Sequence, residues 1–157
     1  MVNVAMLGAS GRMGRTIVPL LHEAADFRLS GALAAPGDTA IGQDAGVLSG
    51  IASLAVPISD DPTMALRGAQ VAIDFTLPAA SARYASLCAG QRCAMVIGTT
   101  GHDAAQRAQA HRVARPHLPE IAPNMSLGVN LLLKLAELAA RALDEQYDIE
   151  IFEAHHR

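Results

Sequence analysis

The chain has 157 residues, enough for one compact domain that buries roughly two thirds of its unfolded surface without disulfides or metals. Its net charge of -3 and its 3% aromatic content do not favour nucleic-acid binding. The opening MVNVAMLGAS has no basic region and only a short apolar run. We therefore expect neither a signal peptide nor a membrane span, and a cytoplasmic protein.

Short apolar runs alternate with helical stretches over residues 1–125. Strands are expected at 2–8, 27–34, 56–59, 71–76 and 93–100 and before residue 122, with helices at 12–24, from 61 and at 78–89. Strands that alternate with helices pair with one another in parallel, because each helix carries the chain back across the sheet. This order therefore predicts a Rossmann-like doubly wound α/β sheet. The glycine-rich residues 35–55 show little periodicity, and we interpret them as a long surface loop.

Three glycines follow the first predicted strand. In LGASGRMG, Gly8, Gly11 and Gly14 form the pattern G-x-x-G-x-x-G where a helix begins. Missing side chains there let backbone amides and the helix N-terminus approach a pyrophosphate. The pattern favours nucleotide binding over a merely tight turn, and it fits coenzyme A as well as NAD(P).

The usual adenosine contact is missing from the second strand. A Rossmann fold places an acidic residue about 20 residues after the glycines, where it binds the ribose hydroxyls. Ala34 and Ala35 stand there, and the nearest acid, Asp38, lies beyond a proline and a glycine. The sequence therefore does not indicate whether NADH or NADPH is preferred.

Polar residues follow the fourth and fifth strands. IDFTLP places Asp74, Phe75 and Thr76 at a carboxyl end, although Asp74 could equally cap the next helix. VIGTTG places Thr99 and Thr100 between glycines, which suits a nicotinamide or a carboxylate. A capped turn is the alternative interpretation.

The pattern changes after residue 125. One long helix is expected at 126–146, with Ser126 as N-cap and one polar stripe along it: Asn130, Lys134, Glu137, Arg141 and Asp144. A strand over 147–157 follows. We predict a first domain at 1–125 and the start of a second at 126–157.

The remaining cysteines and histidines show no metal spacing. Cys88 and Cys93 are expected to be small buried residues. Four histidines are expected to face solvent: His22, His102, His111 and His117. His155 and His156 could be a tag remnant, a metal site or part of an active site; neighbours on a strand point to opposite faces, which disfavours a shared metal.

Five motifs in order, GASGRMGR, DFTLP, GTTG, APNMSLGVN and DIEIFEAHHR, resemble the dihydrodipicolinate reductases. The resemblance implies an NAD(P)H-dependent reduction of 4-hydroxy-tetrahydrodipicolinate in lysine and diaminopimelate biosynthesis, and a second domain that binds this dicarboxylate and builds a tetramer. His155 would donate a proton and His156 would contact the substrate. The cofactor would be bound by residues of four motifs: Gly8, Ala9, Ser10, Gly11, Arg12, Met13, Phe75, Thr76, Gly98, Thr99, Thr100, Ala122, Pro123, Asn124 and Met125.

The family's pattern continues with a catalytic lysine two residues beyond Arg157 and a DAPSGTA segment. We therefore expect the 157-residue chain to bind NADH or NADPH without useful turnover. Two alternatives remain: a non-catalytic nucleotide- or coenzyme-A-binding Rossmann module, and a homoserine or semialdehyde dehydrogenase relative.

Overall fold

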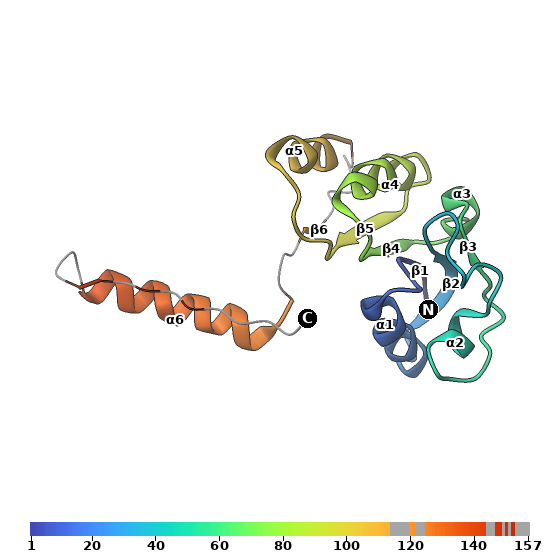
Figure 1. Ribbon diagram of the computed structural model, residues 1–157, viewed down its shortest axis with the longest axis horizontal. Helices are drawn as coiled ribbons and strands as arrows, with labels where there is room; N and C mark the ends of the chain where they lie inside the picture. Colours follow the sequence, from blue (N-terminus) through green and yellow to red (C-terminus); the bar gives the residue numbers. More distant parts are fainter. Residues whose placement is uncertain (114–119, 122–124, 144–146, 149, 151, 153–157) are drawn as a thin grey trace. The chain divides into compact units, whose positions relative to one another are not determined.

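The computed structural model describes residues 1–113, 120–121, 125–143, 147–148, 150 and 152. Contacts divide the chain into two compact units, Met1–Pro123 and Asn124–Arg157. The first unit contains the sheet and most helices, and the second contains one long helix (Figure 1). Each unit is described by itself.

Six strands form one sheet in the order β3-β2-β1-β4-β5-β6, and every neighbouring pair is parallel. The strands are β1 (Val2–Leu7), β2 (Phe27–Leu33), β3 (Ile58–Ser59), β4 (Val71–Asp74), β5 (Ala94–Ile97) and β6 (Glu120–Ile121). The order runs outward in both directions from β1 and β4, so the topological switch point lies between these two strands. The predicted Rossmann-like doubly wound sheet is confirmed.

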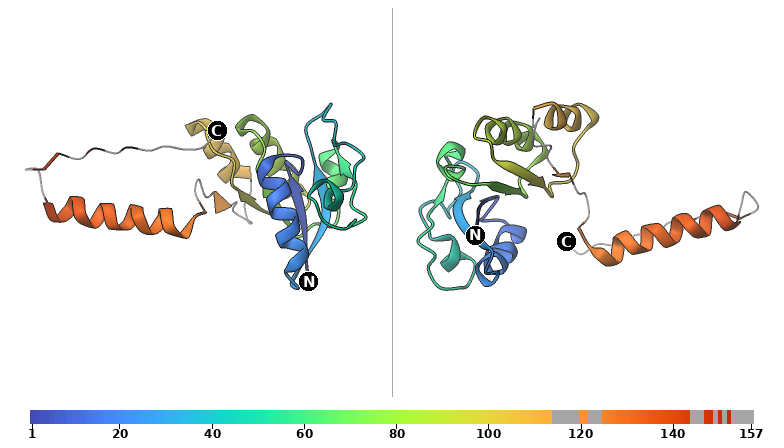
Figure 2. Two further views of the ribbon diagram at one scale, coloured as in Figure 1. Left: turned by 60° about the horizontal axis from the view of Figure 1, so that its bottom comes forward. Right: turned by 180° about the vertical axis from the view of Figure 1, so that it is seen from behind.

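Helices cover both faces of this sheet (Figures 1 and 2). They are α1 (Arg12–Glu23), α2 (Ala45–Leu48), α3 (Pro62–Ala65), α4 (Pro78–Gly90) and α5 (Ala104–Val113). Val4 and Met6 of β1 pack in a cluster with α1, whereas Ala5 and Leu7 pack in a cluster with α3 and α4. Because both faces are buried, the strands show no alternation of apolar and polar residues.

Helix α1 continues through Pro19. Proline has no N–H to donate to the carbonyl four residues before it, so this helix lacks one internal hydrogen bond. Helix α3 begins as its sequence predicts: Asp61 is the N-cap, its carboxylate accepts from the Thr63 and Met64 amides, and Pro62 is the first helical residue.

The two cysteines are buried side chains of the core, as predicted, with 1% and 2% exposure for Cys88 and Cys93. Both are free thiols at the junction of α4 and β5, where the Cys93 amide donates to the Cys88 carbonyl at 2.9 Å. The side-chain hydrogen bond to Cys93, together with burial, raises the pKa of the Cys88 thiol. A protonated, buried thiol is a packing residue rather than a nucleophile.

The interpretation of residues 35–55 as a long surface loop is wrong in part. The segment contains α2, and Ala40 and Ala45 are buried to 2% and 1% exposure. The cause is the Asp44 carboxylate, which accepts hydrogen bonds from four backbone amides, those of Gly46, Val47, Leu54 and Val56, at 2.9–3.1 Å. One carboxylate thus provides acceptors for backbone amides that have no partner in a helix or sheet. Hydrophobic periodicity in the sequence cannot reveal such contacts.

An Asp44→Asn variant should lose part of the acid dependence of folding stability. Burial opposes ionisation of Asp44, but the amides of Leu54, Val47 and Val56 outweigh it and lower its pKa to about 2. Because the pKa is lower in the folded state, the ionised Asp44 stabilises the fold at pH values above its unfolded-state pKa of about 3.9. This stability is lost as the pH falls through the folded-state pKa of about 2. Urea denaturation from neutral pH to the lowest pH at which the protein folds would measure this.

The variant is expected to be less stable at neutral pH and to lose less stability on acidification than the wild type. Parallel stability curves for the two proteins would show that Asp44 does not carry this titration.

The second unit contains α6 (Leu127–Leu143). Ser126 caps it as predicted, because its hydroxyl accepts from the Val129 amide at 3.3 Å. Glu137 binds Lys134 at 3.1 Å and Arg141 at 2.7 Å, so this part of the predicted polar stripe is an ion-pair chain rather than only solvated. Every residue of α6 is exposed.

The strand predicted over 147–157 falls mostly outside the described residues. The four described residues among them, Tyr147, Asp148, Glu150 and Phe152, are not in a strand. Within the described parts of the chain, no helix has both the length and the apolar character needed to cross a membrane.

Candidate functional site

The glycine turn lies at the carboxyl end of β1, at the switch point of the sheet. The amides of Gly8 and Ala9 both donate to the Leu33 carbonyl of β2, at 2.9 and 2.8 Å, and the Gly11 amide donates to the Gly8 carbonyl at 3.1 Å. Gly8 has a φ of +83°, a conformation that favours glycine. The turn is therefore held by its own backbone and by the neighbouring strand.

The third glycine allows α1 to lie directly on the turn. A Cβ on Gly14 would meet the Gly8 carbonyl oxygen and would lie 2.6 Å from both Cα and O of Ala9. These are backbone atoms with no flexible side chain that could move away. Gly14 therefore sets the close approach of helix and strand, the role that the third glycine of a dinucleotide turn has.

The N-terminus of α1 carries no side-chain cap. Its N-cap is Gly11, and no acidic residue lies in its first turn. The short helices α2 and α3 differ, because Asp44 and Asp61 cap them. The first amides of a helix lack intrahelical acceptors, so the α1 terminus, with its partial positive charge, suits an anionic group.

Phe75 connects three segments at this edge of the sheet. Its amide donates to the Leu7 carbonyl at 3.1 Å. A Cβ on Gly8 would lie 2.6 Å from the Phe75 carbonyl oxygen, and a Cβ on Gly98 would meet the Phe75 ring. The glycine turn, the end of β4 and the end of β5 are therefore in direct contact.

The Asp74 carboxylate is fully buried at 0% exposure and organises the turn after β4. Its Oδ1 accepts from the amide and the hydroxyl of Thr76 at 3.0 and 2.6 Å, and its Oδ2 accepts from the Ser81 hydroxyl in α4. The N-cap of α4 is Leu77, so Asp74 is not the helix cap that was the alternative interpretation. It anchors Thr76 beside Phe75 instead.

The GTTG motif continues this edge from β5. The amides of Gly98 and Thr99 both donate to the Asp74 carbonyl, at 2.9 and 3.2 Å. Thr99 is 6% exposed, and its hydroxyl lies 3.4 Å from the same carbonyl, whereas Thr100 is exposed. Thr99 thus has a structural partner, and Thr100 presents its side chain to solvent.

The expectation that His102 faces solvent is wrong. His102 follows GTTG directly and is only 9% exposed. Its Nε2 is buried without a hydrogen-bond partner among the residues that the structure describes. His22 is exposed as expected, whereas His117 and the side chain of His111 lie outside the part of the chain that the structure describes.

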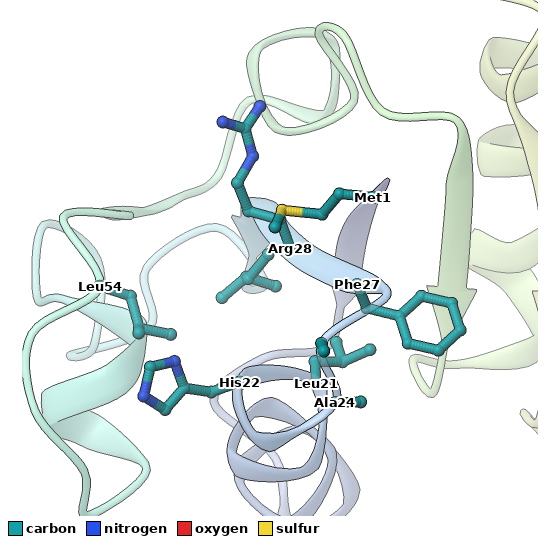
Figure 3. Close-up of a pocket in the computed structure, with 9 residues that line it drawn as sticks. Met1, Leu21, His22, Ala24, Phe27, Arg28 and Leu54 are labelled. Carbon is teal, nitrogen blue, oxygen red and sulfur yellow. The ribbon is translucent and has the colours of Figure 1, made fainter.

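A cavity of about 330 Å³ lies at the opposite, amino edge of the sheet (Figure 3). It is lined by residues around the starts of β1 and β2, including Met1, Phe27 and Arg28, with His22 and Leu54 close by. Open α/β sheets bind ligands outside the carboxyl ends of their strands. The motifs of the sequence converge on that carboxyl edge and not on this cavity.

A family profile described as the N-terminus of dihydrodipicolinate reductase matches residues 2–125. The chain belongs to the dihydrodipicolinate reductase family. The family resemblance that the five motifs indicated is therefore confirmed.

The similar curated proteins include 4-hydroxy-tetrahydrodipicolinate reductases from several bacteria. The one from Nitrosomonas europaea is 46% identical over 156 residues, and the one from Thiobacillus denitrificans is 49% identical over 156 residues. Each alignment covers 99% of this chain and 58% of the relative. The chain thus spans less than two thirds of the length of the dihydrodipicolinate reductases that it matches.

Two solved structures are similar to this chain, and one of them is a dihydrodipicolinate reductase. The dipicolinate-bound dihydrodipicolinate reductase from Paenisporosarcina sp. TG-14 has a TM-score of 0.71 and 26% identity, and covers 88% of this chain and 53% of that one. Aspartate semialdehyde dehydrogenase with NADP from Candida albicans has a TM-score of 0.52 at 14% identity and covers 64% of this chain and 30% of that one. The second likeness shows the fold alone.

The structure brings together most of the residues predicted from the dihydrodipicolinate reductase motifs. Gly8 to Gly11, Phe75, Thr76 and Gly98 to Thr100 follow three strand ends that contact one another at the carboxyl edge, and Arg12 and Met13 begin α1 directly after the glycine turn. Met125 is exposed in the second unit. Five predicted residues lie outside the described part of the chain: Ala122, Pro123, Asn124, His155 and His156.

Sequence reasoning missed one contact of this edge. The Ser10 hydroxyl in the glycine turn donates to the Asp38 carboxylate at 2.6 Å. The two residues are separated by α1 and β2, and Asp38 is four positions beyond the place where an acid is usual. Its position in a tight Pro-Gly-Asp turn was the only available signal.

Proposed function

We propose that this chain is the NAD(P)H-binding part of a 4-hydroxy-tetrahydrodipicolinate reductase. The observation that supports this most strongly is the glycine turn at the switch point of the sheet, with an uncapped helix behind it, in a chain of this family. The complete enzyme would reduce its cyclic dicarboxylate substrate to tetrahydrodipicolinate for lysine and diaminopimelate biosynthesis.

In this proposal the first motif binds the pyrophosphate. The close packing at Gly8 and Gly14 leaves no room for a side chain at either position. Anionic oxygens could therefore approach the backbone amides at the start of α1 and the partial positive charge of the helix. The residues assigned to this role are Gly8, Ala9, Ser10, Gly11, Arg12 and Met13.

The ends of β4 and β5 would border the nicotinamide, which supplies a hydride when bound in reduced form. The Phe75 ring lies against the Gly98 backbone and gives this region an apolar wall. Thr76 is fixed by Asp74, and Thr100 presents an exposed hydroxyl. Phe75, Thr76, Gly98, Thr99 and Thr100 would thus orient the ring and limit the access of water.

The remaining roles are assigned by the family motifs. Ala122, Pro123, Asn124 and Met125 would line the nicotinamide side, His155 would donate a proton, and His156 would contact the substrate carboxylates. Imidazole suits proton donation because its ordinary pKa of about 6.5 is near working pH. We propose a second domain from residue 126 that completes the substrate site and forms a tetramer in a cytoplasmic enzyme.

Calorimetric titration with NADH, NADPH and coenzyme A tests the cofactor assignment. We expect at least one of the two nicotinamide nucleotides to bind with 1:1 stoichiometry in the micromolar range, and coenzyme A to bind much more weakly. Tighter binding of coenzyme A would favour the alternative, a non-catalytic Rossmann module. Binding of none of the three would contradict the proposal.

A Gly11→Val variant should bind the nucleotide more weakly in the same titration. Gly11 is exposed with an ordinary extended backbone, and a Cβ there would lie 3.3 Å from the nearest atom, the Gly8 carbonyl oxygen. The variant should therefore fold, but its side chain would stand where the pyrophosphate approaches. Binding should weaken by about tenfold or more, or about 1.4 kcal/mol, and a cooperative thermal transition would show that the variant is still folded.

A further inference from the structure

The end of β2 offers no group to bind a ribose. Ala34 is 3% exposed, and its amide donates to the Ser59 carbonyl at 2.9 Å. Ala35 is exposed but has only a methyl group. The strand end where Rossmann proteins usually read the adenosine 2′ position is therefore apolar in this chain.

A tight turn brings Asp38 back to the glycine motif. The Asp38 amide donates to the Ala35 carbonyl at 3.1 Å, and Gly37 supplies a φ of +81°. The carboxylate is held at both oxygens: Oδ1 accepts from the Ala40 amide at 2.8 Å, and Oδ2 accepts from the Ser10 hydroxyl at 2.6 Å. Ala40 is 2% exposed and anchors the turn in the core.

The carboxylate remains ionised and keeps free acceptor capacity. The hydrogen bonds from Ser10 and then Ala40 hold the pKa of Asp38 below its usual value. An ionised carboxylate has about four lone-pair sites, and these two hydrogen bonds use two of them. The two neighbouring hydroxyl groups of a ribose could donate hydrogen bonds to the two remaining lone-pair sites of the Asp38 carboxylate.

The Arg15 side chain, a cation near Asp38, binds the backbone of the glycine turn. The Arg15 Nε donates to the Ser10 carbonyl at 2.9 Å, so this guanidinium is held on the turn beside Asp38. Its charge favours the ionised carboxylate. A 2′-phosphate would carry close to two negative charges toward that carboxylate, whereas a 2′-hydroxyl would donate a hydrogen bond to it.

We propose that Asp38 is the specificity-determining residue of the cofactor site and that it selects NADH over NADPH. The inference rests on the proposed function, because it places the adenosine ribose next to a pyrophosphate on the glycine turn. The carboxylate reaches this place from outside the second strand, through its hydrogen bond to Ser10.

The test compares the Kd values of NADH and NADPH for the wild type and for Asp38→Asn, at one fixed ionic strength because salt screens the repulsion. Asp26→Asn is the matched control: it removes the same charge from an exposed residue just before β2, at the amino edge of the sheet. The wild type should bind NADH about tenfold or more tightly than NADPH. Asp38→Asn should reduce this ratio about tenfold, and Asp26→Asn should leave it unchanged.

A wild-type ratio at or below one, or a ratio that Asp38→Asn changes by less than about twofold, would overturn the inference and leave the proposed function intact. Failure of the wild type to bind either nucleotide would overturn both. Thermal unfolding of each variant shows whether a changed ratio comes from a folded protein.

Discussion

A Gly14→Ala variant should lose both folding stability and nucleotide binding. The added methyl group would meet the Gly8 carbonyl oxygen and two atoms of Ala9 at 2.6 Å. All three are backbone atoms, so α1 must move away from β1 or the turn must deform. Overpacking of this kind costs about 1–3 kcal/mol, and the rigid neighbours here place the expected cost at the upper end or beyond.

Gly90→Ala is the matched control for that variant. Gly90 is the last residue of α4, and a Cβ there would have no heavy atom within 4 Å. Its stability should therefore stay equal to the wild type or rise slightly, because alanine favours helix more than glycine does. Urea denaturation of both variants measures the difference. Equal stabilities would show that α1 does not need its close approach to the turn.

An Asp74→Ala variant should be destabilised by about 2–4 kcal/mol. The fully buried carboxylate accepts hydrogen bonds from the amide and hydroxyl of Thr76 and from the hydroxyl of Ser81. Removing it leaves the buried Ser81 hydroxyl and the half-buried Thr76 donors without this acceptor, and it opens a cavity beneath the end of β4. Thermal and urea denaturation would measure the loss.

Asp74→Asn separates the hydrogen bonds from the volume of this side chain. Its amide oxygen can still accept from Thr76, and the Ser81 hydroxyl can rotate to accept from the amide nitrogen. This variant should therefore cost less than Asp74→Ala. If the two variants were equally stable, or if the exposed control Asp26→Ala cost as much, the network around Asp74 would not be the cause.

The sequence predicted those parts of the fold that have local causes. The glycine turn, the Asp61-Pro62 start of α3 and the Ser126 cap are each specified by a few neighbouring residues. The alternating elements predicted the doubly wound sheet because parallel pairing leaves few other arrangements. The same locality predicted that the motif-bearing strand ends lie together at the carboxyl edge.

Contacts between distant residues could not be predicted in this way. Asp44 binds amides up to 12 positions away, and Asp38 reaches Ser10 across 28 positions. Neither produces a periodic pattern, and both lie among glycines that are typical of an exposed loop. The burial of His102 likewise depends on tertiary packing rather than on the polar sequence around it.

Amide NMR during a titration with NADH would report where on the protein the nucleotide binds. We expect saturable chemical-shift changes that are largest at the amides of residues 8–13 and 98–100, at the carboxyl edge of the sheet. Shifts that instead cluster around Phe27 and Arg28, at the cavity of the amino edge, would contradict the proposed nucleotide-binding site.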